Sequence, residues 1–187
     1  MRLFVTVTVL LLAACGAQSI DLTQAPAAEA GTSQLRCSST VDCPSGSYCE
    51  TTACGEAMGT CELFPAECPD DDAPVCGCDR ITYFNDCLRQ ANGAASAKPG
   101  PCKLDEGTVC GGKMDTPCPE GTLCARFIGP GPCPMDAMGN CWAVPASCPG
   151  KTVAKPEWDS CFSFYKCVDT CTAIKTGGPY RHAFMCN

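Results

Sequence analysis

Cysteine is the residue type in this sequence with the most chemistry to explain. It supplies 21 of the 187 residues, above the roughly 8–10% that marks a disulfide scaffold. Structural zinc sites favour Cys-x-x-Cys knuckles together with histidine, but the sequence has no Cys-x-x-Cys and its single histidine is His182. The cysteines therefore predict a disulfide framework formed in an oxidising compartment, with no metal and no cofactor.

Other residues that could carry catalysis are few. A Ser-His-Asp or Cys-His site would have to use His182, close to the last residue, and no nucleophile-elbow motif is present. The run Asp70-Asp71-Asp72 offers three carboxylates, which we interpret as a solvated acidic loop rather than a cation site. We therefore expect a protein that is not an enzyme.

The N-terminus has the organisation of an export signal. After Met1-Arg2, the apolar run from Leu3 to Ala14 suits a signal peptide and is too short for a membrane span, which takes about 20 residues. The run ends in Leu-Ala-Ala-Cys15, which resembles the lipobox of bacterial lipoproteins, whose cysteine is acylated and becomes the first residue. The alternative is an ordinary signal peptide cut at a nearby alanine, with Cys15 discarded.

The segment after the signal predicts a tether. Residues 15–36 are rich in Ala, Gln, Thr, Ser and Gly and have little to bury. Gly16 follows Cys15, whereas in Gram-negative lipoproteins, which this segment resembles, an Asp there favours retention at the inner membrane. We therefore expect a protein of the bacterial cell envelope, anchored through lipid on Cys15 at the outer membrane or cell surface. The net charge of −7 argues against nucleic-acid partners, and we expect a monomer.

Two stretches of the chain share their cysteines and the residues around them. Residues 57–69 (AMGTCELFPAECP) align with residues 137–149 (AMGNCWAVPASCP), and the Cys-Pro-x-Gly-x-x-Cys blocks that begin at Cys43 and Cys118 align with each other. Because these blocks recur in the same order, they predict a duplicated module.

The module boundaries follow from the cysteine positions. Ten cysteines lie in residues 37–102, the first module, and ten in the second module, residues 110–187. Residues 103–109 are the expected linker. Neither module is long enough for a large core, so disulfides would supply much of the stability, at roughly 2–5 kcal/mol each. The expected fold class is small and disulfide-rich, with two tandem modules of short β-hairpins and one short helix each.

Each module is predicted to contain one helix. The first begins at Asn85 or Asp86, which can cap it, and ends at Asn92-Gly93. The second is predicted to begin at Asp159 or Ser160 and to run through Cys171, because the apolar residues between them have helical spacing.

Part of the first module resembles a known family. From Cys68 the chain reads Pro-Val-Cys76-Gly-x-Asp, then Thr-Tyr83-x-Asn85-x-Cys87, and it closes with Gly-Pro-Cys102. These residues and gaps resemble the Kazal domain of serine protease inhibitors, over about residues 61–102. The second module keeps the hairpin part without these motifs, so it is interpreted as a diverged Kazal-like copy.

The resemblance implies a set of disulfides. It gives Cys68–Cys87 and Cys76–Cys102. The family's remaining cysteine, usually on the helix, is absent, and Cys78 is interpreted as its displaced counterpart, which gives Cys61–Cys78. Four cysteines then remain in the first module and form two more bridges in a hairpin, with three pairings open: Cys37, Cys43, Cys49 and Cys54.

The same resemblance implies a protease-binding loop. It comprises Pro69 to Ala73, with Asp70–Asp71 as the bond presented to the protease. Its implied supports are Pro74, Val75, Tyr83 and Asn85. The implied activity is inhibition of a secreted serine protease, but Asp70 would be repelled by a trypsin-like pocket and would have to be desolvated in an apolar one. The alternative is a non-inhibitory protein-binding or adhesion module on the same scaffold.

Overall fold

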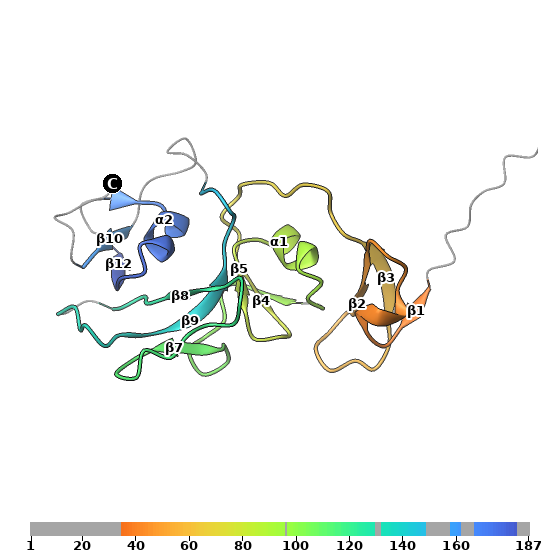
Figure 1. Ribbon diagram of the computed structural model, residues 1–187, viewed down its shortest axis with the longest axis horizontal. Coiled ribbons are helices and arrows are strands. Elements are labelled where there is room, and N and C mark those ends of the chain that lie inside the picture. Colours follow the sequence, from red (N-terminus) through yellow and green to blue (C-terminus); the bar gives the residue numbers. More distant parts are fainter. Residues whose placement is uncertain (1–34, 96, 130–131, 149–157, 162–166, 183–187) are drawn as a thin grey trace, which may run out of the picture. The chain divides into compact units, whose positions relative to one another are not determined.

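A computed structural model describes residues 35–95, 97–129, 132–148, 158–161 and 167–182 (Figure 1). Within them the chain is small and disulfide-rich, and it consists mostly of short strands with two short α-helices and nine disulfides. The fold class expected from the cysteines is therefore confirmed. The signal segment and Cys15 lie outside the described residues, as does almost all of the tether, residues 15–36.

The first module opens with a three-stranded sheet. Its strands are β1 (Arg36–Cys37), β2 (Ser47–Glu50) and β3 (Gly59–Leu63), in the order β1-β3-β2, and the 3-10 helix η1 (Thr40–Asp42) precedes β2. A Pro-x-Gly turn leads into β2, where the amide of Ser47 donates to the carbonyl of Pro44 at 3.1 Å and Gly46 has a φ of 85°. A residue with a side chain rarely adopts that φ, so the turn requires glycine.

The second part of the first module surrounds a short helix. It contains β4 (Val75–Gly77), β5 (Thr82–Tyr83), α1 (Asp86–Ala91) and β6 (Ala97–Pro99), and β4 lies between β5 and β6. Asn85 caps α1 at its start and Asn92 at its end. The first predicted helix is therefore confirmed with its capping residues.

The second module opens with a hairpin sheet of its own. Its strands are β7 (Val109–Gly111), β8 (Leu123–Ala125) and β9 (Met138–Ala143), and β9 pairs antiparallel with both of the others. A second Pro-x-Gly turn leads into β8, with Gly121 at a φ of 79°. β9 also pairs in parallel with β5, through Thr82 opposite Trp142 and Tyr83 opposite Ala143. One sheet, β6-β4-β5-β9-β7, therefore runs through both modules (Figure 1).

The last elements correct the second predicted helix. Residues 158–160 form strand β10 (Trp158–Ser160) and residues 167–168 form β11 (Cys167–Val168), and among the described residues of this stretch only α2 (Thr170–Lys175) is helical. Residues 162–166 of the predicted helix lie outside the described residues. Together with β12 (Tyr180–His182) the strands form a sheet in the order β11-β10-β12. The helical spacing was misleading because β10 satisfies its backbone groups by pairing with β11 and β12, and sequence spacing does not report such pairing.

The core joins the modules. One buried cluster combines Ile81, Tyr83 and Ala94 of the first module with Cys110, Cys141 and Ala143 of the second. The expected linker also makes contacts: the Arg80 side chain donates to the carbonyls of Glu106 and Gly107, at 2.8 and 3.0 Å. The segment between the modules is thus fixed to the first of them.

Neither described helix has the length and apolar character needed to cross a lipid bilayer, since each spans six residues.

Candidate protease-binding loop

The loop between Cys68 and Cys76 is exposed and anchored at both ends. Residues 69–73 are all exposed. Cys68 is bonded to Cys87 at the start of α1, and Cys76 is bonded to Cys102. These are two of the three pairings that the family resemblance implied. A segment held in this way has little backbone entropy to lose when it binds a partner.

Asn85 supports the loop from below. Asn85 is buried, with only 3% of its surface exposed. Its Oδ1 accepts from the backbone amide of Leu88 at 2.8 Å, which caps α1. Its Nδ2 donates to the carbonyl of Pro69 at 2.8 Å and to the carbonyl and side chain of Asp71, each at 3.2 Å. One amide therefore fixes the helix and the backbone on both sides of Asp70.

The C-terminal side of the loop is held by the sheet. The amide of Ala73 donates to the carbonyl of Phe84 at 3.2 Å, and the amide of Gly100 donates to the carbonyl of Pro74 at 2.8 Å. Val75 begins β4 and pairs with both Tyr83 and Pro99. Pro74 and Val75 thus connect the exposed segment to paired strands.

Tyr83 supports the hairpin under the loop. It is 4% exposed, and its hydroxyl donates to Asp79 at 2.6 Å in the turn between β4 and β5. Burial raises the pKa of the Tyr83 phenol, and the hydrogen bond to Asp79 raises it further. The hydroxyl stays protonated and keeps this turn closed.

Arg89 also holds α1 in place, a role that the sequence did not indicate. It lies on α1 and is only 3% exposed. Its guanidinium pairs with Asp86 at 2.6 Å and with Glu50 of β2 at 2.8 Å, and it also donates to the carbonyl of Ala94. Burial acts to lower the Arg89 pKa, but the hydrogen bonds with Asp86 and Glu50 outweigh it and the net shift is upward. Charged helix residues usually face solvent, so no local pattern indicated this role.

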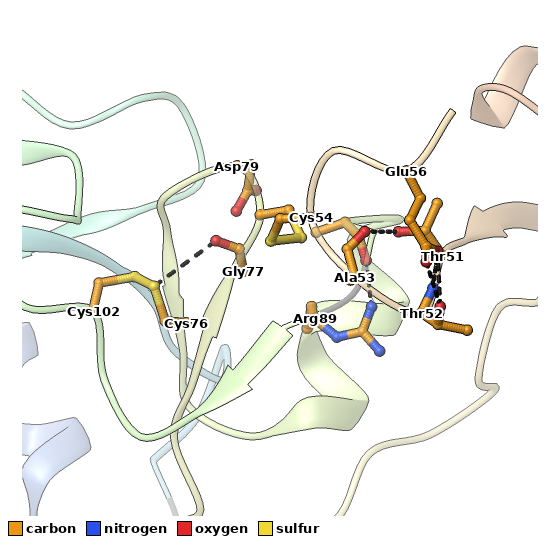
Figure 2. Close-up of a disulfide and its surroundings, with 12 residues drawn as sticks. Thr51, Thr52, Ala53, Cys54, Glu56, Cys76, Gly77, Asp79, Arg89 and Cys102 are labelled. Atoms are coloured by element: carbon orange, nitrogen blue, oxygen red, sulfur yellow. Dashed lines mark hydrogen bonds between the residues drawn. A yellow bond between two sulfur atoms is a disulfide. The ribbon is translucent and has the colours of Figure 1, made fainter. Parts of the chain in front are cut away.

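The third predicted disulfide is wrong. Cys61 is bonded to Cys43. Cys78 is bonded to Cys54, whose disulfide is drawn in Figure 2. Of the four cysteines expected to pair among themselves, only Cys37 and Cys49 do so. The reason is topological: Cys61 lies on β3 inside the hairpin sheet, whereas Cys54 lies in the connection between β2 and β3 and comes within 5.2 Å (Cα to Cα) of Cys78.

The cysteines that cluster within the described residues are disulfide-bonded, so they offer no thiolates to a metal. The close groupings of possible metal ligands there are built on Cys37, Cys110 and Cys148 with their neighbours, and these cysteines are disulfide-bonded. A disulfide sulfur is not the thiolate that zinc requires. What the described site can offer is an exposed and acidic peptide segment that is anchored at both ends.

Residues 64–98 match the family described as the Kazal-type serine protease inhibitor domain. The match covers the loop, β4, β5 and α1. The first module therefore contains a Kazal-like domain, as its motifs indicated, and a second cysteine-rich region follows it. Such domains inhibit proteases and are not themselves enzymes.

Proposed function

We propose that residues 69–73 form the protease-binding loop of a Kazal-type inhibitor module, with Asp70–Asp71 as the bond presented to the protease. The observation that carries the proposal is the side chain of Asn85, which holds the carbonyls of Pro69 and Asp71 while capping α1. An inhibitor of this kind must keep its loop in place even when the bond is attacked. Bracing from a buried amide and anchoring by two disulfides meet that requirement.

The acidic loop narrows the choice of target. Asp70, Asp71 and Asp72 are all exposed, so a protease pocket that itself carries an acid would repel them. The target class is therefore a serine protease that accepts acidic residues. A panel of purified proteases should show inhibition of an enzyme that cleaves after Glu or Asp, and none of trypsin.

The scaffold can be tested apart from the wild-type specificity. We expect Asp70→Arg to bind trypsin about a hundredfold or more tighter than the wild-type protein, because a repulsion is replaced by a charge pair in the pocket. A second variant adds Asp71→Ser and Asp72→Ser to remove the neighbouring charges. Rapid cleavage of both variants as ordinary substrates, or no binding of either, would contradict the inhibitor proposal.

A non-inhibitory binding module is the second candidate, and the three acidic residues favour it. Such a module would use the same exposed loop as a fixed acidic surface for a basic protein. It predicts that no protease of the panel is inhibited and that both Arg variants fail to trap trypsin.

We also propose that lipid on Cys15 tethers the protein to the bacterial cell envelope, at the outer membrane or cell surface. The support is the sequence from Leu12 to Cys15 after a short apolar run. Replacing Cys15 with Ser should abolish incorporation of labelled fatty acid and release the protein from the membrane fraction. Absence of label on the wild-type protein would contradict the tether.

A further inference from the structure

A cleft lies between the C-terminal half of the loop and the second module. Its volume is about 520 Å³, within the roughly 300–1,000 Å³ of small-ligand sites. It is lined by Asp72 of the loop and the adjoining Pro74, and by Phe127, Met138 and Tyr180 of the second module. The loop and the second module therefore share the lining of one cleft.

Three large apolar side chains of this cleft are exposed to solvent. Leu104, Phe127 and Met138 are each 52% exposed. Single exposed apolar residues are common, but three around one hollow form a patch of the kind that marks a binding site. Beneath them, Trp142 and Tyr180 are almost fully buried, and the rings of Phe127 and Tyr180 lie 5.9 Å apart. The cleft thus has an aromatic floor and apolar walls.

One charged side chain is found among the described residues that line the cleft. Asp72 is its acidic lining residue, and none of the described lining residues is basic. Asp72 and Tyr180 line the same cleft, and burial raises the pKa of the Tyr180 phenol, with a further rise from the Asp72 charge. A ligand with an apolar stem and a positive end would meet ring faces along the stem and Asp72 at the end.

We propose that this cleft binds a lysine or arginine side chain of the protein held at the loop, on the C-terminal side of the Asp70–Asp71 bond. This proposal rests on the proposed function in one respect: the side chain that enters the cleft belongs to the protein that binds the loop. It gives the second module a role, since Phe127, Met138 and Tyr180 complete a site that the loop alone lacks. The partner is then a protein with a basic residue beside the surface that contacts Asp72.

The test uses the full mature chain and two peptide probes. One probe is acetyl-Leu-Arg-Leu-amide, and the other replaces Arg with citrulline, which has nearly the same shape but no charge. Titration followed by amide chemical shifts should show the arginine peptide binding about tenfold tighter, as an ion pair and a ring contact together imply. The shifts should map to residues around Phe127 and Met138.

Matched variants separate the cleft from its surroundings. Asp72→Asn should abolish the preference for arginine, whereas Asp70→Asn should leave it unchanged. Met138→Ala should weaken both peptides, whereas Met114→Ala, at a position 91% exposed and outside the cleft lining, should weaken neither. Phe127→Ala should act like Met138→Ala.

Several results would overturn the proposal. One is equal affinity for the two peptides, and another is a preference for arginine that survives Asp72→Asn. A third is that the amide chemical shifts change at residues away from the cleft. A fourth is that sedimentation shows the protein self-associating in a way that covers the cleft. Failure of the Asp70→Arg variants to trap trypsin would instead refute the inhibitor function and leave the charge preference of the cleft measurable. The two ideas can therefore fail separately.

Discussion

The helix of each module begins with a capping side chain, and the two caps differ by one chemical group. Asn85 accepts from Leu88 at the start of α1 and donates from its amide nitrogen to Pro69 and Asp71. Asp169 caps α2 by accepting from the amide and hydroxyl of Thr172, at 2.8 and 2.7 Å. A carboxylate has no proton to donate. Both residues suffice for a helix, but only the amide can also hold a neighbouring loop carbonyl.

The strands around the two helices correspond in order and register. Val75 and Cys76 of β4 face Tyr83 and Thr82, and Trp158 and Asp159 of β10 face Val168 and Cys167. Asp159 thus stands at the register position of Cys76, and Cys161 stands at that of Cys78.

The disulfides follow this correspondence. Four bridges of the first module have a counterpart in the second, and the pairs of bridges are Cys37–Cys49 with Cys110–Cys124, Cys43–Cys61 with Cys118–Cys141, Cys54–Cys78 with Cys133–Cys161, and Cys68–Cys87 with Cys148–Cys171. The scaffold is therefore alike in both modules, while the groups that hold the exposed loop, residues 69–73, are present at β4 and α1. Substitutions in the shared disulfides and substitutions in the groups that hold the loop should therefore have separable effects.

Removing a bridge from either module should have the largest effect. Replacing both Cys76 and Cys102 with Ala, or both Cys148 and Cys171, should lower the free energy of unfolding by about 2–5 kcal/mol. Because the modules share a sheet and a core, each variant should shift a single urea transition of the whole protein. Two separate transitions, of which only one moves, would show that the modules are independent.

Two corresponding glycines should be equally intolerant of a side chain. A Cβ at Gly59 would lie 2.1 Å from the carbonyl oxygen of Glu50, and one at Gly139 would lie 2.2 Å from that of Ala125. Gly59→Ala and Gly139→Ala should each cost about 1–3 kcal/mol in thermal unfolding, as overpacked positions do. Gly129→Ala, which meets no atom within 4 Å, is the control. A large difference between the two variants would show that the hairpins are not equivalent.

The caps give a smaller and more selective effect. Asn85→Ala and Asp169→Ala should each cost about 0.5–2 kcal/mol through loss of the cap. Asn85→Asp should keep most of the stability but free the loop, because aspartate caps without donating. Hydrogen exchange and limited proteolysis at residues 69–73 would measure that freedom. If Asn85→Asp leaves the loop as protected as wild type, the amide is not its brace.

The smallest expected effect is a loss of folding stability at alkaline pH, to which a tyrosine of each module contributes. The pKa values of Tyr83 and Tyr180 are raised above the ordinary 10.0, in each case chiefly by burial. A raised pKa in the folded state stabilises the protein fully below pH 10.0, and that stability is lost as the pH rises further. Absorbance titration at 295 nm should show late ionisation, and Tyr83→Phe and Tyr180→Phe should each remove one late group. Normal titration of either tyrosine would contradict its burial.

Local features of the first module could be predicted from the sequence. Asn85 and Asn92 signalled the limits of α1 because capping depends on residues within one turn. The spacing from Cys68 to Cys102 indicated two bridges and the loop, because the family fixes those gaps. The resemblance implied Tyr83 as a support without indicating its partner Asp79. The role of Arg89 was not indicated, because its partner Glu50 lies on a distant strand, β2.

Non-local features could not be predicted. The disulfide Cys54–Cys78 forms because the connection between β2 and β3 reaches the β4–β5 turn in the folded chain. The number of residues between cysteines does not reveal that proximity. Helical spacing after Cys161 did not exclude the pairing of β10 with β11 and β12. The cleft was missed for the same reason: Asp72 and Phe127 are far apart in sequence, and the pairing of β5 with β9 joins the modules that carry them.

The pairing of β5 with β9 also bears on how the protein is made. A chain synthesised from its N-terminus presents residues 35–102 before β9, which spans residues 138–143, exists. Until then β5 is an open edge, and open edges are where nascent chains associate with one another. The strand that covers this edge comes from the chain's own second module, so the first module has its complete sheet only after the second module has been made.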